Sequence, residues 1–318
     1  MRLAGGLLLA VATGWTLSCR APEAQPAQPS AALAAVDSGD YPLVLFNDAT
    51  YVELAVGEAR GLFLFDTGAN TSGIDGGWLA KAGVRGTFED GGQLAGTTGV
   101  RRVQKVVLPR LGLGTGYFLE PRFVVSDYRA FAHPPAGRQV GLLGTDLLVN
   151  YEVSIDYRAR RARLALRNER RERSGAWQAT GLTYPLNLPT VNARLGGVDM
   201  PCRLDSGASY LEDRPYLDGN VAALRALRAA GHELHQVGSL RVRGVTGGQT
   251  LKLYQGGLSL EVGPRRIDDV ILVVHPSGSL ARKDPLLLAG GTIISRWERV
   301  VLDPFDRLLW LPVETPTD

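Results

Sequence analysis

The sequence predicts an all-β protein made of two similar lobes, with only a few short helices. One short motif occurs twice, as F-D-T-G-A-N at 65–70 and as L-D-S-G-A-S at 204–209. The acids of the two copies, Asp66 and Asp205, are 139 residues apart, which is about the length of one compact domain. Short apolar runs also alternate with the tight turns that 39 glycines and 18 prolines favour.

The individual elements follow from the spacing of apolar residues. Strands are predicted at 50–56, 60–65, 103–108, 122–125, 162–166, 258–262, 269–274, 299–302 and 308–311. Helices are predicted at 77–82 and at 216–230, where four apolar residues lie near helical spacing. Single helical turns are predicted at 145–149 and 292–296.

The repeat extends beyond the acid motif. L-L-G-T-D-L-L at 142–148 corresponds to A-G-G-T-I-I-S at 289–295, and Y-E-V-S-I-D-Y at 151–157 corresponds to E-R-V-V-L-D-P at 298–304. Each half also has a polar, glycine-bearing turn between its acid motif and this element, where Thr98 and Thr246 are 148 residues apart. The offset therefore grows by nine, and we expect the extra residues between 209 and 243.

Two equivalent loops that each present one carboxylate suggest two lobes with paired acids at their junction. Two carboxylates about 3 Å apart cannot both ionise cheaply, so such a pair shares one proton. The ionised member can take a proton from water while the protonated member donates one to a carbonyl oxygen. Asp66 and Asp205 are therefore the candidate catalytic acids.

Other catalytic arrangements are not supported. His232 and His235 form H-E-L-H, which lacks the H-E-x-x-H spacing of a zinc protease, and no metal or other cofactor is expected. The G-x-S-x-G motif of the common serine hydrolases is absent from the sequence.

The two acid motifs, together with the apolar-apolar-Gly elements at 142–144 and 289–291, resemble the pepsin and retropepsin superfamily of aspartic proteases. The resemblance covers about residues 41–315 and is to a bacterial, two-lobed type with lobes of retropepsin size. It implies that each lobe is a small closed β-barrel, that a hairpin flap covers the cleft, and that the chain is a monomeric pseudo-dimer.

The resemblance also implies roles for single residues. Asp66 and Asp205 match the catalytic acids, Thr67 and Ser206 the hydroxyl residues that brace the acid loops, and Gly68 and Gly207 the glycines beside the carboxylates. The substrate-binding flap tips would hold Gly96, Thr97, Thr98, Gly99, Val245, Thr246 and Gly247. Neither flap has the tyrosine of the pepsin flap, and Gly290 stands where a bulkier residue is usual.

These features predict an exported aspartic endopeptidase that binds an extended peptide or protein substrate as an added strand. One alternative is a catalytically weak or inactive peptide-binding envelope lipoprotein with the same fold. Another is a structural envelope protein whose barrels hold a partner.

The N-terminus predicts export. Arg2 precedes an apolar run at 3–17, which is short for a membrane span, and the run ends in T-L-S-C. This ending resembles a bacterial lipobox, which implies lipidation of Cys19 and a membrane anchor on the extracytoplasmic, periplasmic side of the envelope. Cleavage after Ala34 is the alternative. Cys202 is expected to be a buried thiol.

The expected organisation is a signal peptide at 1–19, a flexible tether at 20–40, an N-terminal lobe at 41–168, a linker at 169–178 and a C-terminal lobe at 179–318. The net charge is +3, and eight arginines with two glutamates lie at 158–173. This strip predicts a solvated linker, with an anionic membrane surface as the alternative partner. No aromatic residues interleave its arginines as a nucleic-acid platform, so nucleic acid is not expected.

Overall fold

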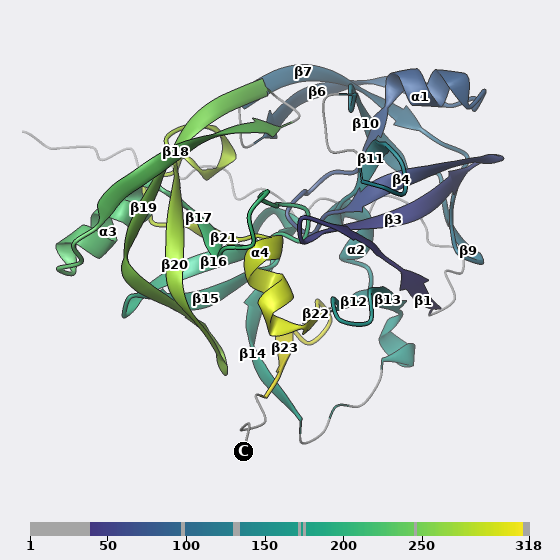
Figure 1. Cartoon of the computed structure of the whole chain (residues 1–318). Helices are drawn as coiled ribbons and strands as arrows, with labels where there is room; N and C mark the ends of the chain where they lie inside the picture. Colours follow the sequence, from purple (N-terminus) through teal and green to yellow (C-terminus); the bar gives the residue numbers. More distant parts are fainter. Residues whose placement is uncertain are drawn as a thin grey trace, which may run out of the picture.

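The computed structural model describes residues 39–96, 99–129, 134–170, 173, 176–244 and 247–313. Strands dominate, which confirms the all-β prediction (Figure 1). The α-helices of these ranges are α1 (Gly76–Lys81), α2 (Thr145–Leu148), α3 (Val221–Ala229) and α4 (Gly291–Ile294). Within the same ranges, no helix has the length and apolar character that crossing a membrane requires.

The first lobe is one curved sheet with the order β6-β7-β10-β5-β11-β4-β3-β8-β9, and β2 pairs with β3. Its strands are β2 (Val44–Phe46), β3 (Ala49–Val56), β4 (Ala59–Phe65), β5 (Gly73–Asp75), β6 (Thr87–Gly96), β7 (Gly99–Val107), β8 (Arg110–Leu113), β9 (Gly116–Leu119), β10 (Arg122–Ser126) and β11 (Gln139–Leu143).

The second lobe contains a closed barrel with the order β15-β16-β21-β17-β20-β19, because β19 pairs with β15 as well as with β20. Its strands are β15 (Thr190–Leu195), β16 (Val198–Leu204), β17 (Tyr216–Asn220), β18 (His235–Gly244), β19 (Gly247–Val262), β20 (Arg265–His275) and β21 (Leu287–Ala289). β18 extends the sheet beyond β19.

The two lobes differ where prolines interrupt the first one. β19 and β20 are long and continuous, whereas the first lobe divides the same path into β7 and β8 and into β9 and β10. Pro109 and Pro121 lie at these two breaks, where a residue without an N–H cannot continue a ladder. The carbonyl of Pro121 still accepts a hydrogen bond from the amide of Leu108 (3.0 Å), which holds the broken ends together.

The nine extra residues of the second lobe lie in two places. The residue that caps the helix is Asp75 in the first lobe, nine residues after Asp66, and Asn220 in the second, fifteen residues after Asp205. Six of the extra residues therefore precede the helix, and the other three lengthen α3 relative to α1. The prediction of a helix from residue 216 was wrong for its first turn, because 216–220 form the buried strand β17 between β20 and β21.

One sheet joins the lobes, with the order β1-β13-β12-β22-β23-β14. Its strands are β1 (Gly39–Pro42), β12 (Glu152–Asp156), β13 (Arg161–Ala165), β14 (Trp177–Thr183), β22 (Arg299–Asp303) and β23 (Leu308–Pro312). The segments at 151–157 and 298–304, which the sequence identified as repeats, pair with each other as antiparallel β12 and β22. A continuous apolar core also runs through both lobes. The domain limits given above stay a prediction.

Arginines of the predicted linker contact this shared sheet. Arg170 binds Asp303 (2.7 Å) and also Asp306. Arg173 binds Glu152 on β12 at 2.6 Å, in a pair whose side chains are only 10% and 1% exposed, and its guanidinium lies over the ring of Trp310 on β23. Part of the arginine strip is therefore engaged with the protein itself.

We expect Arg173→Ala to lower the free energy of unfolding by about 3 kcal/mol, because it leaves the Glu152 carboxylate buried without its partner. Denaturant unfolding measures this change. The matched control is Arg60→Ala, which removes a pair with Glu53 at 2.8 Å whose side chains are 72% and 59% exposed. That variant should lose less than about 1 kcal/mol. Equal losses in the two variants would contradict a structural role for the buried pair.

Candidate active site

The two acid loops begin where two buried strands end. β4 ends at Phe65 and β16 ends at Leu204, and each lies parallel to a neighbouring strand, β11 or β21. The amide of Asp66 donates to the carbonyl of Leu143 (3.0 Å), and that of Asp205 donates to Ala289 (2.9 Å). Each acid is therefore fixed at the edge of its own lobe by the strand beside it.

Backbone amides of the loops then orient the carboxylates. Asp66 Oδ1 accepts the N–H of Gly68 at 2.9 Å, and Asp205 Oδ1 accepts the N–H groups of Gly207 and Ala208, also at 2.9 Å. Such turns, in which an acid caps the amide two residues later, are the local preference of an Asp-x-Gly sequence.

The loops are braced against each other by their hydroxyl residues. Thr67 Oγ1 accepts the amide of Ser206 (3.0 Å) and donates to the carbonyl of Leu204 (2.8 Å). Reciprocally, Ser206 Oγ accepts the amide of Thr67 (3.2 Å) and donates to the carbonyl of Phe65 (2.5 Å). Both side chains are buried. The structure thus brings Thr67 and Ser206 together across the two loops.

The glycines of the motif allow the two carboxylates to approach each other. A Cβ on Gly68 would lie 2.0 Å from Cγ of Asp205, and a Cβ on Gly207 would lie 2.7 Å from Cγ of Asp66. No side chain fits at either position without displacing the opposite acid. The loop of each lobe therefore touches the carboxylate of the other lobe.

The paired acids are buried, each about 9% exposed, and a side-chain hydrogen bond links them. Burial raises the pKa of Asp66 well above its usual range, and the neighbouring charge of Asp205 raises it further. Burial also raises the pKa of Asp205. Two like charges in a buried site favour a single shared proton, so the titration belongs to the pair.

The apolar-glycine elements support the loops from behind. The amide of Thr145 donates to the carbonyl of Ala69 (2.8 Å), and in the second lobe the amide of Gly291 donates to Ala208 (2.7 Å). A Cβ on Gly290 would lie only 3.0 Å from the carbonyl oxygen of Ala208. Close approach of the second acid loop therefore explains the glycine at this position.

Several polar residues around the acids are not marked by any recognisable sequence motif. Thr50 donates to the carbonyl of Phe65 (2.9 Å), and the Ser72 hydroxyl donates to Asp146 (2.7 Å) behind the first loop. In the second lobe, Asp218 accepts hydrogen bonds from Tyr210 and His275. Of these residues only Asp146 lies within a motif that the sequence had singled out, L-L-G-T-D-L-L at 142–148, which places it beside the acid loop.

The predicted flaps lie at the ends of two hairpins. β6 and β7 pair as far as Gly96 and Gly99, and β18 and β19 pair as far as Gly244 and Gly247. Both hairpins lie at the top of the view in Figure 1. Their tips, with Thr97, Thr98, Val245 and Thr246, lie outside the described residues, as do the signal peptide and Cys19. Their roles stay predictions.

Two other expectations concern cysteine and metal. Cys202 is fully buried in β16, and burial raises the pKa of its thiol to about 12, which makes it a structural rather than a reactive cysteine. Among the described residues, no group of histidine, cysteine, aspartate and glutamate side chains is arranged to hold a metal ion.

Two all-β lobes with one buried acid loop each, braced across a shared junction, define the acid-protease class of fold. A comparison with models of known families agrees, because residues 52–147 match the aspartyl protease family. This match lies in the first lobe and supports a pepsin- and retropepsin-like aspartic protease family, which indicates a peptidase of the hydrolase class. No curated protein matched the sequence.

The raised pKa of Asp66 predicts that the protein is less stable at neutral pH than its amide variant. An unfolded aspartate has a pKa of about 3.9, so above that pH the folded state binds more protons than the unfolded state. The contribution of the acid to stability is complete below the unfolded pKa and is lost as the pH rises through the folded pKa. The cost is about 1.4 kcal/mol for each unit by which the pKa is raised.

Thermal unfolding at pH 7 and pH 4 measures this difference. Asp66→Asn should unfold at a higher temperature than the wild type at pH 7, with a smaller difference at pH 4. Asp199→Asn, at an exposed position, is the control and should not show this pH dependence. A wild type that is more stable than Asp66→Asn at pH 7 would show that ionisation of the pair does not oppose folding.

Proposed function

We propose that the protein is an aspartic endopeptidase in which Asp66 and Asp205 activate a water molecule to hydrolyse peptide bonds. The observation that carries the proposal is the pair itself. Two buried carboxylates are held by backbone amides, linked by a hydrogen bond and braced across both lobes. Burying two acids beside each other opposes folding, and a protein that only bound peptides would gain nothing from that cost.

The reaction follows from the shared proton. The ionised carboxylate takes a proton from water, whose oxygen bonds to the carbonyl carbon of the scissile peptide, while the protonated carboxyl donates its proton to the carbonyl oxygen. The tetrahedral diol then collapses: one of its hydroxyls gives its proton to the ionised carboxylate as the new carbonyl forms, the C–N bond breaks, and the leaving nitrogen receives a proton from the protonated carboxyl. One water is consumed, and the dyad ends with the single proton with which it began.

The substrate in this proposal is an extended peptide that lies between the acid loops and the two hairpins. Strand addition supplies backbone hydrogen bonds, and side chains at alternating positions enter pockets on either side. The first hairpin, β6 and β7, contacts the second lobe at the 3-10 turn Gly278–Leu280, so it reaches from one lobe to the other. This arrangement favours a substrate enclosed by both lobes.

The alternative of an inactive peptide-binding lipoprotein with the same fold predicts a different result in a single experiment. Asp66→Asn and Asp205→Asn should each lower kcat for cleavage of a mixed peptide library by at least about a thousandfold while leaving the fold intact, because each removes half of the proton relay. The double variant should be little worse than either single variant, because the acids act as one unit.

The pH profile supplies a second readout of the same experiment. Wild-type activity should be greatest where the pair holds one proton, and should fall at low pH when both acids are protonated and at high pH when both are ionised. Substantial cleavage by either single variant would exclude the shared dyad. No cleavage by the wild type at any pH would favour the binding protein.

We also propose that the protein is exported and anchored through Cys19 at the extracytoplasmic face of a bacterial membrane. The support is the sequence alone, an apolar run that ends in T-L-S-C and is followed by a segment rich in alanine, proline and glutamine. Mass spectrometry of the mature N-terminal peptide should find an acylated cysteine, and Cys19→Ala should release the protein from membranes. A mature N-terminus near Ala35 would support export without the anchor.

A further inference from the structure

The first lobe has a hollow that is lined mainly by charged side chains. It is a cavity of about 1180 Å³ between α1, the hairpin strands β6 and β7, the strand β10, and the residues Asp127, Arg129 and Arg138. The apolar part of its wall comes from Phe88, Val103 and Val125, and the rest is strongly charged. Neither the motifs nor the dyad assigns it a role.

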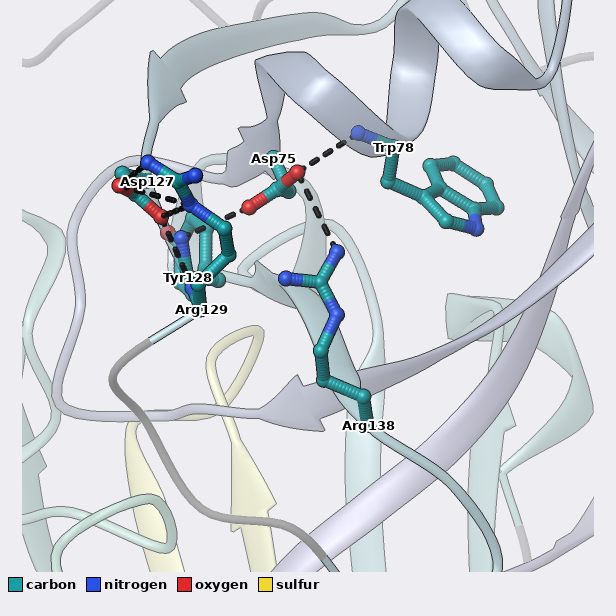
Figure 2. A network of polar contacts seen from close by, with 6 residues as sticks. All are labelled: Asp75, Trp78, Asp127, Tyr128, Arg129 and Arg138. Carbon is teal, nitrogen blue, oxygen red and sulfur yellow. Dashed lines mark hydrogen bonds and ion pairs between the residues drawn. The ribbon is translucent and has the colours of Figure 1, made fainter.

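Three of the four acids that line this cavity are paired with arginines. Figure 2 shows Asp75 accepting the amides of Trp78 (2.6 Å) and Tyr128 (2.8 Å) and a contact from Arg138 (3.3 Å). It also shows Asp127 bound by Arg129 (2.6 Å), a pair that lowers the pKa of this carboxyl far below its usual range.

A third acid of the wall, Asp90, accepts the amide of Gly92 (3.1 Å) and is bound by Arg102 (2.6 Å), and these two contacts lower its pKa. The remaining lining charges are Arg101 and the oppositely charged Lys81 and Glu89, both of which are solvent-exposed at the rim. The anionic groups of the wall therefore offer little attraction for a cation.

Among the four arginines of the wall, Arg101 is the one without a carboxylate partner in the described part of the chain, since Arg102, Arg129 and Arg138 each bind an acid. It is half-buried on β7, and one terminal nitrogen donates to the hydroxyl of Ser126. Its buried Nε has no hydrogen-bond partner in the described part of the chain. A guanidinium that is not paired with a carboxylate of the protein favours a planar anion that accepts two parallel hydrogen bonds, which is the geometry of a carboxylate.

Tyr128 connects the wall of the cavity to the interior of the first lobe. It follows the wall residues Ser126 and Asp127, is fully buried, and its hydroxyl lies 2.2 Å from where a Cβ on Gly73 would be. Burial raises the pKa of Tyr128, with a further increase from Asp66 and an opposing effect from Arg101, so the phenol lies within electrostatic reach of both. Arg101 also follows Gly99, the end of the flap turn, by two residues.

The position equivalent to Arg101 in the second lobe holds no cation. Strand registers match Arg101 to Gln249 and Ser126 to His275. Gln249 and His275 bind each other (3.2 Å), and His275 also binds Asp218, which accepts a hydrogen bond from Tyr210. The polar groups on that side are therefore engaged with one another, whereas Arg101 retains a free donor.

We propose that the cavity is a specificity subsite that takes an acidic side chain of the peptide substrate, with its carboxylate bound by Arg101. This inference rests on the proposed peptidase function and adds the substrate class. A glutamate or aspartate on one side of the scissile bond would place its carboxylate on the guanidinium and its aliphatic stem against Phe88, Val103 and Val125.

The test uses fluorescently labelled decapeptides of alternating alanine and leucine, in which a single glutamate is moved through every position, together with a matched glutamine set. Binding is measured by fluorescence anisotropy with the Asp66→Asn protein, so the result does not depend on cleavage. Cleavage by the wild type is measured in parallel as kcat/KM. Amidated C-termini in both sets exclude recognition of a terminal carboxylate.

Glutamate at one position should bind at least about tenfold more tightly than glutamine there, because a charge-assisted pair replaces a neutral one. This preference should disappear when Arg101→Gln is added and be partly kept by Arg101→Lys. Arg101→Glu should reverse it, so that lysine is favoured at the same position in a third peptide set. Arg60→Gln removes one positive charge of the same lobe away from the cavity and should keep the preference.

Equal binding of the glutamate and glutamine sets at every position would overturn the subsite, even if cleavage occurs. A glutamate preference that survives Arg101→Gln in a folded protein would also overturn it. Peptide binding with the expected preference but without wild-type cleavage would reject the peptidase and keep the subsite as that of a binding protein. The two proposals therefore fail by different results.

Discussion

The reciprocal hydrogen bonds between Thr67 and Ser206 are the constraint on which the rest of the structure depends. Each hydroxyl accepts a hydrogen bond from an amide of the opposite loop and donates one to a carbonyl at the end of the strand that leads into that loop. Each loop can therefore complete its buried hydrogen bonds only against the other. A displaced lobe would leave several buried backbone groups unpaired at once, each at a cost of about 1–3 kcal/mol. The relative position of the two acids is thus set by backbone geometry rather than by their own attraction.

That constraint also explains how two carboxylates remain side by side. Repulsion and burial act against ionisation of the pair, while the amides of Gly68, Gly207 and Ala208 act in its favour. The amide donors stay in place when the proton moves between the acids, because they belong to turns that are hydrogen-bonded to β11 and β21. A preorganised pair of this kind stabilises charge without rearranging the site.

Sequence reasoning identified these features because they are local. Each acid loop is contiguous, its glycine and hydroxyl residue are adjacent to the acid, and the motif occurs twice at the spacing of a domain. The helix prediction for residues 216–220 was wrong because the structure of this segment depends on distant strands. It contains aspartate, glycine and asparagine, which are poor strand formers, and it becomes β17 only because β20 and β21 pair with it on both sides.

The groups around the dyad were missed for a similar reason. Tyr128 lies 62 residues after Asp66, and His275 lies 57 residues after Asp218, so no spacing rule connects them. Parallel pairing of β5 with β10 and of β17 with β20 brings these distant segments together. The sequence contains that information only through the complete topology, whereas the dyad can be recognised from a few adjacent residues.

Fusion of the two lobes in one chain permits the asymmetry seen on either side of the acids. In a symmetric homodimer, one substitution would change both halves of the cleft in the same way. Here the positions equivalent to Gly73, Arg101 and Ser126 hold Asp218, Gln249 and His275. The first lobe therefore has a guanidinium without a carboxylate partner among the described residues, whereas the three residues of the second lobe are hydrogen-bonded to one another. The brace residues, by contrast, differ only as threonine and serine. Divergence has thus affected the walls of the cleft and left the junction intact, which is the pattern expected when the two halves retain a common reaction but contact different parts of an extended, directional substrate.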